Sequence, residues 1–376
     1  MPPRIIIIAG EASGDLHAAN LAREIKNLRP DVQLSGWGGE TMRRFGVEIY
    51  YPLTKLAVVG FAEVLKNYQK FKRVFDSILE KIDEIKPQAV VLVDYPGFNL
   101  RLARQIKKRN IPIIYYISPQ VWAWGKKRLR LIKRVVDKML VVFRFEQKLY
   151  RDAGIPCVFV GHPLLDIARP TMPIKECLRQ WKIDPGRPRL AILPGSRNKE
   201  VQRLLPIMLR AAKIISEEKI GLQIIILRSS SVPEDIFKEI SKNFSLRTRL
   251  ITEKTYDGLN ICDFAIVASG TATLDTAIMQ RPFVITYRIS TISYFVLKSL
   301  IKIKSIGLVN IVAQKRIIPE LLQKNAHPQK IAREVLGIWR NPKRMAEIKQ
   351  DLARIKSLLT PYGASQAAAK ETLSLI

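Results

Sequence analysis

Short runs of consecutive apolar, often β-branched residues alternate with longer stretches of helical periodicity along most of the chain. Continuous apolar runs of this length are typical of parallel strands buried on both faces, with helices as the connections between them. The runs predict strands at 4–9, 32–37, 88–94, 112–117, 138–143, 157–160, 189–194, 222–227, 263–268 and 283–287. The pattern therefore predicts an α/β protein built on parallel sheets.

A proline-rich passage at 163–188 separates two series of such strands. We therefore expect two Rossmann-like doubly wound domains, at 1–165 and 166–340. Residues 341–376 show no strand pattern and predict C-terminal helices that are free to pack back on the first domain. Because ligands bind at the carboxyl ends of the strands in open sheets, we expect the site in the cleft across which the two domains face each other.

The composition supports a folded protein and adds a strong charge. Of 376 residues, 63 are Lys or Arg and 33 are Asp or Glu, which gives a net charge of +30, while 47% are hydrophobic. Residues 96–151 alone hold 15 Lys and Arg against Asp137 and Glu146. Solvated helix faces, nucleic-acid binding and attraction to anionic lipid headgroups all remain open, because charge alone does not distinguish them.

Other features exclude whole classes of protein. The three cysteines lie far apart with no CxxC pair, which argues against a disulfide scaffold or a structural zinc site and favours a reducing compartment. No uncharged apolar run reaches the roughly 18 residues of a membrane-spanning helix, and the first ten residues are too short for a signal segment. The three histidines are dispersed and form no metal-binding motif. We expect a cytoplasmic protein with an anionic partner, no catalytic metal and no cofactor.

Two loops of the first domain carry candidate chemistry. In GEASGD (10–15), Glu11 and Ser13 follow a buried strand, where polar groups would read substrate hydroxyls, although an ordinary strand-to-helix turn would look similar. Asp94 ends the strand QAVVLVD and precedes a turn stiffened by Pro96 and Gly97. That position suits a general base, and the alternative is a helix cap.

Two loops of the second domain are rich in small residues. In LPGSR, Gly195 would allow backbone amides to face a phosphate, and ASGTATLD (268–275) would begin a helix whose amino end holds a diphosphate. Neither loop matches a P-loop, and GEASGD is not a dinucleotide fingerprint. Two such loops in one domain predict binding of an anionic nucleotide. The candidate ligand positions are Ser196, Arg197, Gly270, Thr271 and Asp275, the last of which could reach sugar hydroxyls.

Two apolar stretches, 56–82 and 291–305, follow a helical pattern edged by lysines and arginines. Burial in the core explains much of this pattern. A basic-edged apolar helix also suits the bilayer interface or a pocket for acyl chains.

With these motifs assembled, the chain resembles the lipid-A-disaccharide synthase family over roughly residues 4–325. The motifs that carry the resemblance are GEASGD, GWGGETM, VDYPGFN, SPQVWAW, FEQKLY, GHPLLD, LPGSRNKEV, ASGTATLD, VNIVAQ and PELLQ, in family order. The resemblance implies a GT-B fold and a metal-independent, inverting transfer. The donor would be UDP-2,3-diacylglucosamine and the acceptor 2,3-diacylglucosamine 1-phosphate (lipid X). The products would be a β(1→6)-linked disaccharide 1-phosphate and UDP, in Gram-negative lipopolysaccharide synthesis.

The resemblance also implies roles for single residues. Asp94 matches the essential aspartate of the family and Arg197 its essential arginine. The loop facing UDP matches Ser269–Thr273, including Thr273, and Asn310 lies in the following segment. Many members have Glu where Asp275 stands, so the side chain here is one methylene shorter. Asp94 would remove the proton from the acceptor hydroxyl, and Arg197 would meet the charge on the diphosphate.

The resemblance gives the +30 charge a partner, an anionic inner-membrane surface with which the protein associates peripherally, and makes nucleic acid the poorer candidate. Three rivals remain: a UDP-sugar epimerase of the same architecture, a nucleic-acid-binding protein and a noncatalytic lipid-binding scaffold. A homo-oligomer is also compatible with the sequence.

Overall fold

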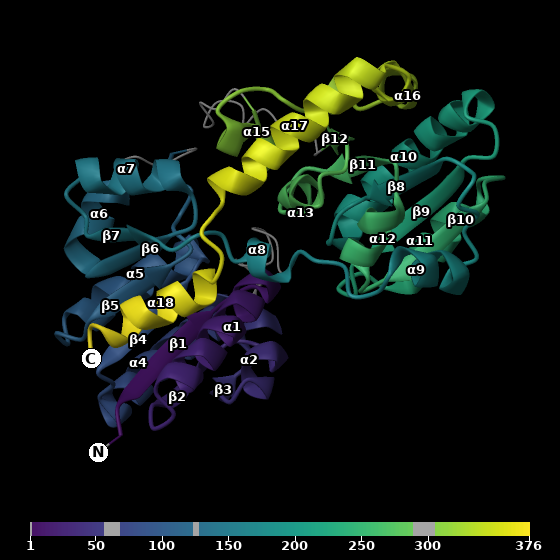
Figure 1. The fold of residues 1–376 in the computed structure, drawn as a ribbon. Coiled ribbons are helices and arrows are strands. Elements are labelled where there is room, and N and C mark those ends of the chain that lie inside the picture. Colours follow the sequence, from purple (N-terminus) through teal and green to yellow (C-terminus); the bar gives the residue numbers. More distant parts are fainter. Residues whose placement is uncertain (1, 56–67, 123–127, 289–304) are drawn as a thin grey trace. The chain divides into compact units, whose positions relative to one another are not determined.

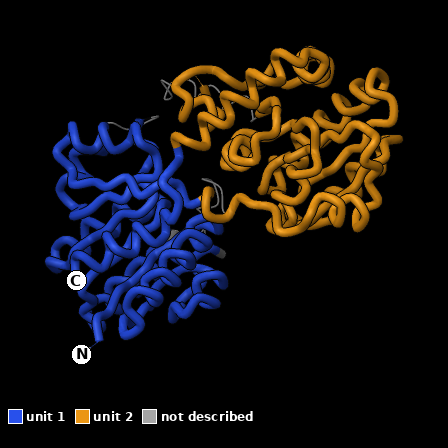
Figure 2. Tube along the Cα trace, in the orientation of Figure 1, with its two compact units in different colours: residues 1–163, 359–376 blue, residues 164–358 orange. Residues whose placement is uncertain are grey.

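The computed structural model describes residues 2–55, 68–122, 128–288 and 305–376. These residues form two compact units, residues 1–163 with 359–376 and residues 164–358 (Figures 1 and 2). The sequence places the boundaries instead at 165/166 and 340/341. The helix that follows 340 belongs to the second unit, and only the last 18 residues return to the first, so residues 341–376 do not act as one segment.

The described part of the first unit contains a seven-stranded parallel sheet in the order β3-β2-β1-β4-β5-β6-β7. The strands are β1 (Arg4–Ala9), β2 (Gln33–Trp37), β3 (Glu48–Tyr51), β4 (Ala89–Val93), β5 (Ile113–Tyr116), β6 (Lys138–Val141) and β7 (Cys157–Phe159). The helices are α1 (Ala12–Leu28), α2 (Glu40–Arg44), α4 (Tyr68–Ile85), α5 (Pro96–Lys107), α6 (Arg128–Val135), α7 (Arg144–Asp152) and α18 (Ala364–Leu373).

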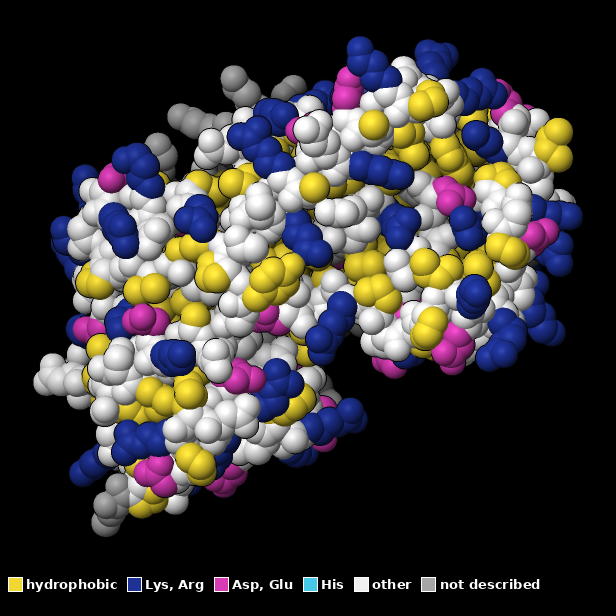
Figure 3. Space-filling model, viewed as in Figure 1, with side chains coloured by type: hydrophobic (Ala, Val, Ile, Leu, Met, Phe, Trp, Pro, Cys, Tyr) yellow, Lys and Arg dark blue, Asp and Glu magenta, His cyan; other side chains and the backbone are white. Residues whose placement is uncertain are grey.

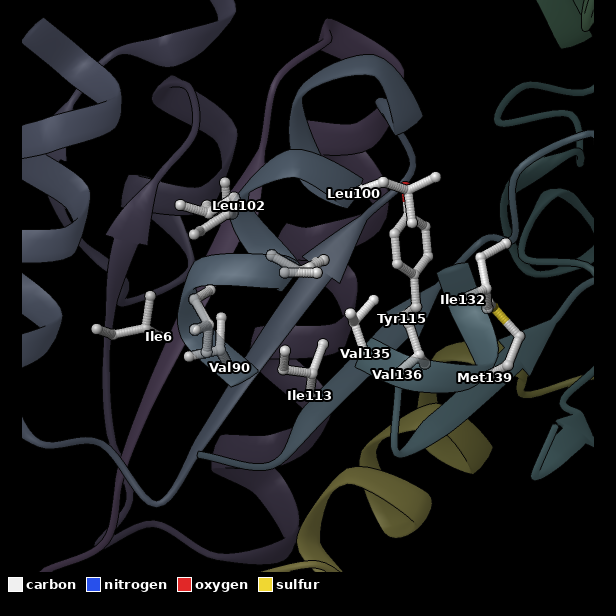
Figure 4. Close-up of a cluster of buried hydrophobic side chains, with 14 of the residues drawn as sticks. Ile6, Val90, Leu100, Leu102, Ile113, Tyr115, Ile132, Val135, Val136 and Met139 are labelled. Carbon is white, nitrogen blue, oxygen red and sulfur yellow. The ribbon is translucent and has the colours of Figure 1, made fainter. Parts of the chain in front are cut away.

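Helices cover the sheet of the first unit on both faces. Ile6, Val90 and Tyr115 point to one face, where they pack with α5 and α6 side chains such as Leu102 and Ile132 (Figure 4). Strand residues alternate between faces, so the neighbouring residues of the same strands point the other way. There α1 packs against β1 and α18 packs against α1. Burial on both faces explains why these strands read as unbroken apolar runs.

The described part of the second unit contains a six-stranded parallel sheet in the order β10-β9-β8-β11-β12-β13. The strands are β8 (Arg189–Leu193), β9 (Gln223–Arg228), β10 (Thr248–Thr252), β11 (Phe264–Ala268), β12 (Phe283–Tyr287) and β13 (Glu320–Leu322). The helices are α8 (Leu164–Ile167), α9 (Ile174–Gln180), α10 (Asn198–Glu218), α11 (Glu234–Lys242), α12 (Thr255–Ile261), α13 (Ala272–Ile278), α15 (Leu308–Ala313), α16 (Pro328–Trp339) and α17 (Pro342–Leu358). The predicted fold class, two doubly wound α/β units, is confirmed.

All ten predicted strands are present, with ends shifted by two residues or fewer. Three further strands escaped the prediction: β3, β10 and β13. Each lies at the edge of its sheet, β3 and β13 are only four and three residues long, and β3 and β10 are only partly buried. Edge strands of this kind carry mixed polar and apolar residues, so they lack the continuous apolar run that marks a central strand.

The structure describes only part of the two apolar stretches, 56–82 and 291–305, that are edged by lysines and arginines. Residues 56–67 and 291–304 lie outside the described residues. Residues 68–82 belong to α4, where Val74, Ile78 and Ile82 are buried in the core of the first unit. Core burial therefore explains the apolar pattern of this part of 56–82.

Candidate functional site

The first candidate site lies where β1 and β4 end side by side in the first unit. Ala9 is paired with Val93 in the parallel ladder, so Gly10–Glu11 and Asp94–Tyr95 leave the sheet next to each other. Glu11 is the N-cap residue of α1, and Ser13 is exposed on the first turn of that helix. The sheet thus brings three of the predicted site residues, Glu11, Ser13 and Asp94, to one edge.

The backbone at Asp94 is held in an uncommon conformation. Asp94 and Tyr95 both have positive φ, 47° and 48°, and a short run of non-glycine residues in this region costs about 1–3 kcal/mol per residue. The Asp94 carbonyl oxygen accepts hydrogen bonds from Tyr115 Oη at 2.6 Å and Asn99 Nδ2 at 2.8 Å. Asn99 Nδ2 also donates to the Val93 carbonyl at 3.2 Å. These buried donors hold the backbone of the turn.

The Asp94 carboxyl group has the electrostatics of a base that works near neutral pH. Burial, and secondarily the negative charge of Glu11, raises its pKa to about 7, while a hydrogen bond from the Tyr95 N–H opposes the rise. Asp94 as a residue is half-buried. The N-cap of α5 is Tyr95, with no side-chain capping bond. The helix-cap alternative therefore does not describe Asp94.

Two further motifs of the first unit position loops at the same edge of the sheet. The buried carboxylate of Asp15, the last residue of GEASGD, accepts hydrogen bonds from the amides of Gly39 at 2.6 Å and Thr41 at 3.0 Å and so holds the GWGGETM loop. Glu146 of FEQKLY accepts a bond from Trp122 Nε1 at 3.0 Å, and Tyr150 Oη donates to the Pro119 carbonyl at 3.1 Å. These acidic residues were not predicted as positioning groups, although their place inside the motifs was a usable signal.

The second candidate site lies where β8 and β11 end side by side in the second unit. Leu193 pairs with Val267, so the loops 194–197 and 269–271 leave neighbouring strands at the same edge. Arg197 is the N-cap residue of α10 and is exposed. Its guanidinium makes no hydrogen bond or ion pair within the residues that the structure describes. Arg197 is therefore available to an anionic ligand.

The amides of the LPGSR loop differ from the expectation. Ser196 N donates to Glu200 Oε2 at 3.2 Å. The loop thus uses an acceptor from its own helix at the place where the sequence predicted a phosphate. Sequence reasoning missed Glu200, although a carboxylate three residues after an N-cap is a recognisable spacing.

The ASGTATLD loop has an exposed rim and a buried base. Gly270 has φ +144° with no atom within 4 Å of a Cβ built on it, so the backbone conformation and not the space demands glycine. Thr271 is exposed at the N-cap of α13, and Ser269 Oγ donates to the Ile306 carbonyl at 3.2 Å. Thr273 is fully buried and donates to the Gly270 carbonyl at 2.8 Å. Its side chain holds the turn from beneath.

Asp275 and Asn310 are both engaged with other groups of the protein. Asp275 Oδ1 accepts a bond from Tyr256 Oη at 2.9 Å, and burial raises the pKa of this carboxyl to about 6. Asn310 is buried, and its Nδ2 donates to the Ile318 carbonyl and to Glu320 Oε1, both at 2.8 Å. Its Oδ1 accepts from the amides of Ile317 and Ile318 at 2.9 and 3.0 Å. With its bonding groups used in this way, Asn310 positions the 306–320 segment beside Ser269.

Two negative findings concern only the residues that the structure describes. No three His, Cys, Asp or Glu side chains among them are grouped in a way that could hold a metal ion. No helix in the same ranges has the length and apolar character needed to cross a membrane.

The fold matches solved structures that bind UDP or UDP-sugars. UDP-GlcNAc 2-epimerase from Neisseria meningitidis, bound to UDP-GlcNAc, superposes with a TM-score of 0.66 over 99% of this chain and 100% of that chain, at 10% identity. The UDP co-structure of MnaA from S. aureus gives a TM-score of 0.69 over 100% and 98% of the two chains, at 11% identity. At this level of identity the likeness shows the fold alone.

The sequence comparisons are far more specific. The family model for lipid-A-disaccharide synthetase matches residues 5–375. Lipid-A-disaccharide synthases from Syntrophus aciditrophicus and Geobacter sulfurreducens are 43% and 40% identical, each over 99% of this chain and 97% of the relative. The synthase from Myxococcus xanthus is 37% identical over 100% of this chain and 98% of its own length. The chain therefore belongs to the lipid-A-disaccharide synthase family.

Proposed function

We propose that this glycosyltransferase of lipid A synthesis takes UDP-2,3-diacylglucosamine as donor and lipid X as acceptor. Formation of the lipid A disaccharide follows from the family, to which the whole chain belongs. The two substrates, the residue roles and the membrane surface are the proposal. The observation that carries it is Asp94, a half-buried residue with a carboxyl pKa raised to about 7 on a strained turn at the carboxyl edge of its sheet.

The proposed step is an inverting substitution. The Asp94 carboxylate takes the proton of the acceptor 6-hydroxyl as that oxygen attacks the anomeric carbon of the donor. The new C–O bond forms on the face opposite UDP, and the electron pair of the breaking bond leaves on the diphosphate. A base with a pKa near 7 is ionised in a large fraction of molecules at neutral pH and still accepts a proton readily.

Donor binding is assigned to the second unit. The free guanidinium of Arg197 would meet the diphosphate charge, together with the loop at Ser269–Thr271, of which Thr271 is exposed. Preorganised donors of this kind commonly supply the largest catalytic contribution. Asp275 would read sugar hydroxyls from its position against Tyr256, and Asn310 would act by holding the neighbouring segment.

The membrane proposal rests on cations of the first unit. On α5 and α6, side chains such as Arg101, Arg104, Arg130 and Arg134 are exposed, and none of these four makes an ion pair within the described ranges. Dark blue Lys and Arg side chains are spread over both units on the face that Figure 3 shows. Attraction of about 1 kcal/mol per such side chain near an anionic surface would hold the enzyme where its lipid substrates reside.

The runner-up function, a UDP-sugar epimerase, has only the distant structural likeness in its favour. One experiment tests both: incubation of the enzyme with UDP-2,3-diacylglucosamine, with and without lipid X, in EDTA, followed by mass analysis of the lipids. We expect disaccharide 1-phosphate and UDP only when lipid X is present. An isomerised donor formed without lipid X would support the epimerase and contradict the transferase.

A further inference from the structure

We propose that Glu200 is a positioning residue that holds the backbone of Arg197 in place for the donor diphosphate. The inference rests on the proposed role of Arg197 and extends it to a residue that the sequence did not mark. It stands on three observations at the start of α10: the hydrogen bonds of Glu200, the space at Gly195 and the exposure of Arg197.

The hydrogen bonds tie Glu200 to the loop before its own helix. Glu200 is the third residue of α10, and its amide donates to the Arg197 carbonyl at 3.0 Å. Its carboxylate turns back and accepts a hydrogen bond from the amide of Ser196, the residue before Arg197, at 3.2 Å. The Arg197 side chain makes no cap of its own. Glu200 therefore gives an acceptor to the Ser196 amide just before this helix start.

The space at Gly195 shows how closely the carboxylate lies on the loop. A Cβ at Gly195 would stand 2.1 Å from Glu200 Oε2 and 2.4 Å from Glu200 Cδ. Gly195 also has φ +117°, a backbone conformation that other residues rarely adopt. The glycine of LPGSR thus makes room for Glu200. From the other side of the loop, Ser231 Oγ donates to the Ser196 carbonyl at 2.8 Å.

The charges around the loop favour the same role. Burial raises the pKa of Glu200, while the Ser196 amide and the charge of Arg197 lower it. Burial raises the pKa of Tyr287, at the end of β12. The charge of Glu200 adds to this rise, and the charges of Arg197 and Arg203 oppose it. Glu200 is half-buried and its carboxylate is bonded to the Ser196 amide, whereas Arg197 is exposed. Glu200 thus fixes the backbone of the loop, and the Arg197 guanidinium stays available to the ligand. A preorganised anion site needs both.

The test measures UDP binding by calorimetry and kcat and KM for the donor in E200A, E200Q, R197A and the double variant E200A/R197A. Glu176 is the matched control, because it is also the third residue of its helix, α9, but is exposed. Thermal unfolding of E200A and E176A measures the stability that each variant loses with a carboxylate at a helix start. This loss can then be separated from an effect on the UDP site.

We expect E200A to weaken UDP binding roughly tenfold, the effect of one helix-cap interaction. E200Q should recover most of this, because its amide oxygen can still accept from the loop. E176A should bind UDP normally. In the R197A background, E200A should cause little further loss, since Glu200 acts through Arg197.

Four outcomes overturn the inference. Full additivity of E200A and R197A would show that Glu200 acts on its own. Tighter UDP binding by E200A would show that the Glu200 carboxylate competes with the diphosphate for the Ser196 amide. Unchanged UDP binding and turnover in R197A would remove the proposed role of Arg197 itself. Weaker UDP binding in R197A with unchanged binding in E200A would leave the role of Arg197 intact and refute that of Glu200.

Discussion

The ring of Tyr95 lies directly against the backbone of Gly10. A Cβ at Gly10 would stand 2.1 Å from Tyr95 Cδ1 and 2.6 Å from Cε1, a distance at which one of the two residues must move. Gly10 follows β1 and Tyr95 follows Asp94 after β4, so the contact joins two residues that lie 85 positions apart in the chain. The first glycine of GEASGD therefore serves the placement of the Asp94 turn.

We expect G10A to displace Tyr95 and, with it, Asp94. Overpacking of this kind costs about 1–3 kcal/mol of unfolding free energy. Turnover should fall by more than the loss of folded protein explains. The matched control is G97A, because a Cβ at Gly97 meets no atom within 4 Å. Chemical denaturation and a lipid X transfer assay on both variants check this, and equal turnover in G10A and G97A would contradict it.

D94N should fold normally and lose transfer by at least roughly 100-fold, the usual contribution of a positioned general base. The amide has nearly the same shape as the carboxylate but cannot take the proton of the acceptor hydroxyl. UDP binding should be retained, because Asp94 belongs to the first unit and donor binding is assigned to the second. Near-normal turnover in the transfer assay would remove Asp94 as the base.

The charge of Glu11 should shift the pH at which the enzyme becomes active. Burial comes first and Glu11 second in raising the pKa of Asp94 to about 7, and only the ionised form is a base. Activity should therefore rise with pH through about 7. E11Q should move this acid limb to lower pH, because one of the two causes of the raised pKa is gone. The exposed E80Q of α4 is the control, and an unmoved limb in E11Q would refute the coupling.

The buried carboxyl of Glu146 should make stability fall as pH rises. Burial raises its pKa from 4.5 to about 7, so the folded state holds a proton that the unfolded state has lost in this window. The contribution is fully present below about pH 4.5 and is lost toward pH 7, which amounts to ~1–3 kcal/mol. E146Q should flatten this slope in urea denaturation between pH 5 and 7. A slope equal to that of the unmodified protein would contradict the assignment.

Reversal of four exposed cations on α5 and α6, R101E/R104E/R130E/R134E, should release the enzyme from anionic vesicles. At about 1 kcal/mol per side chain, vesicle affinity should fall at least roughly 1,000-fold. Turnover on detergent-dispersed substrate should persist. The control reverses four exposed cations of the second unit, Lys175, Arg179, Lys213 and Lys242. Sedimentation with phosphatidylglycerol vesicles measures both, and equal loss in the two variants would show that net charge alone decides binding.

The central strands could be predicted from sequence because burial on both faces leaves a local signature. Ile5–Ile8 and Ala89–Val93 are almost fully buried, and each consists of apolar residues alone. The placement of Asp94 and Arg197 at strand ends follows from the same pattern, since parallel strands bring their carboxyl ends to one edge. Edge strands such as β10 have one paired side and weaker burial, so the same signature is absent.

What a side chain does at that edge depended on tertiary contacts. The sequence by itself determined the fold class, the family and the loops that carry chemistry. Only the tertiary structure decided that Glu200 accepts the Ser196 amide at the loop predicted to hold a phosphate, and that Tyr95 requires a glycine at position 10. It also decided that Asn310 bonds to the backbone of Ile317 and Ile318 and to the Glu320 carboxylate. The reason is physical: strand formation is governed by short-range apolar pattern, whereas hydrogen-bond satisfaction and close packing are settled between groups that meet only when the chain is folded.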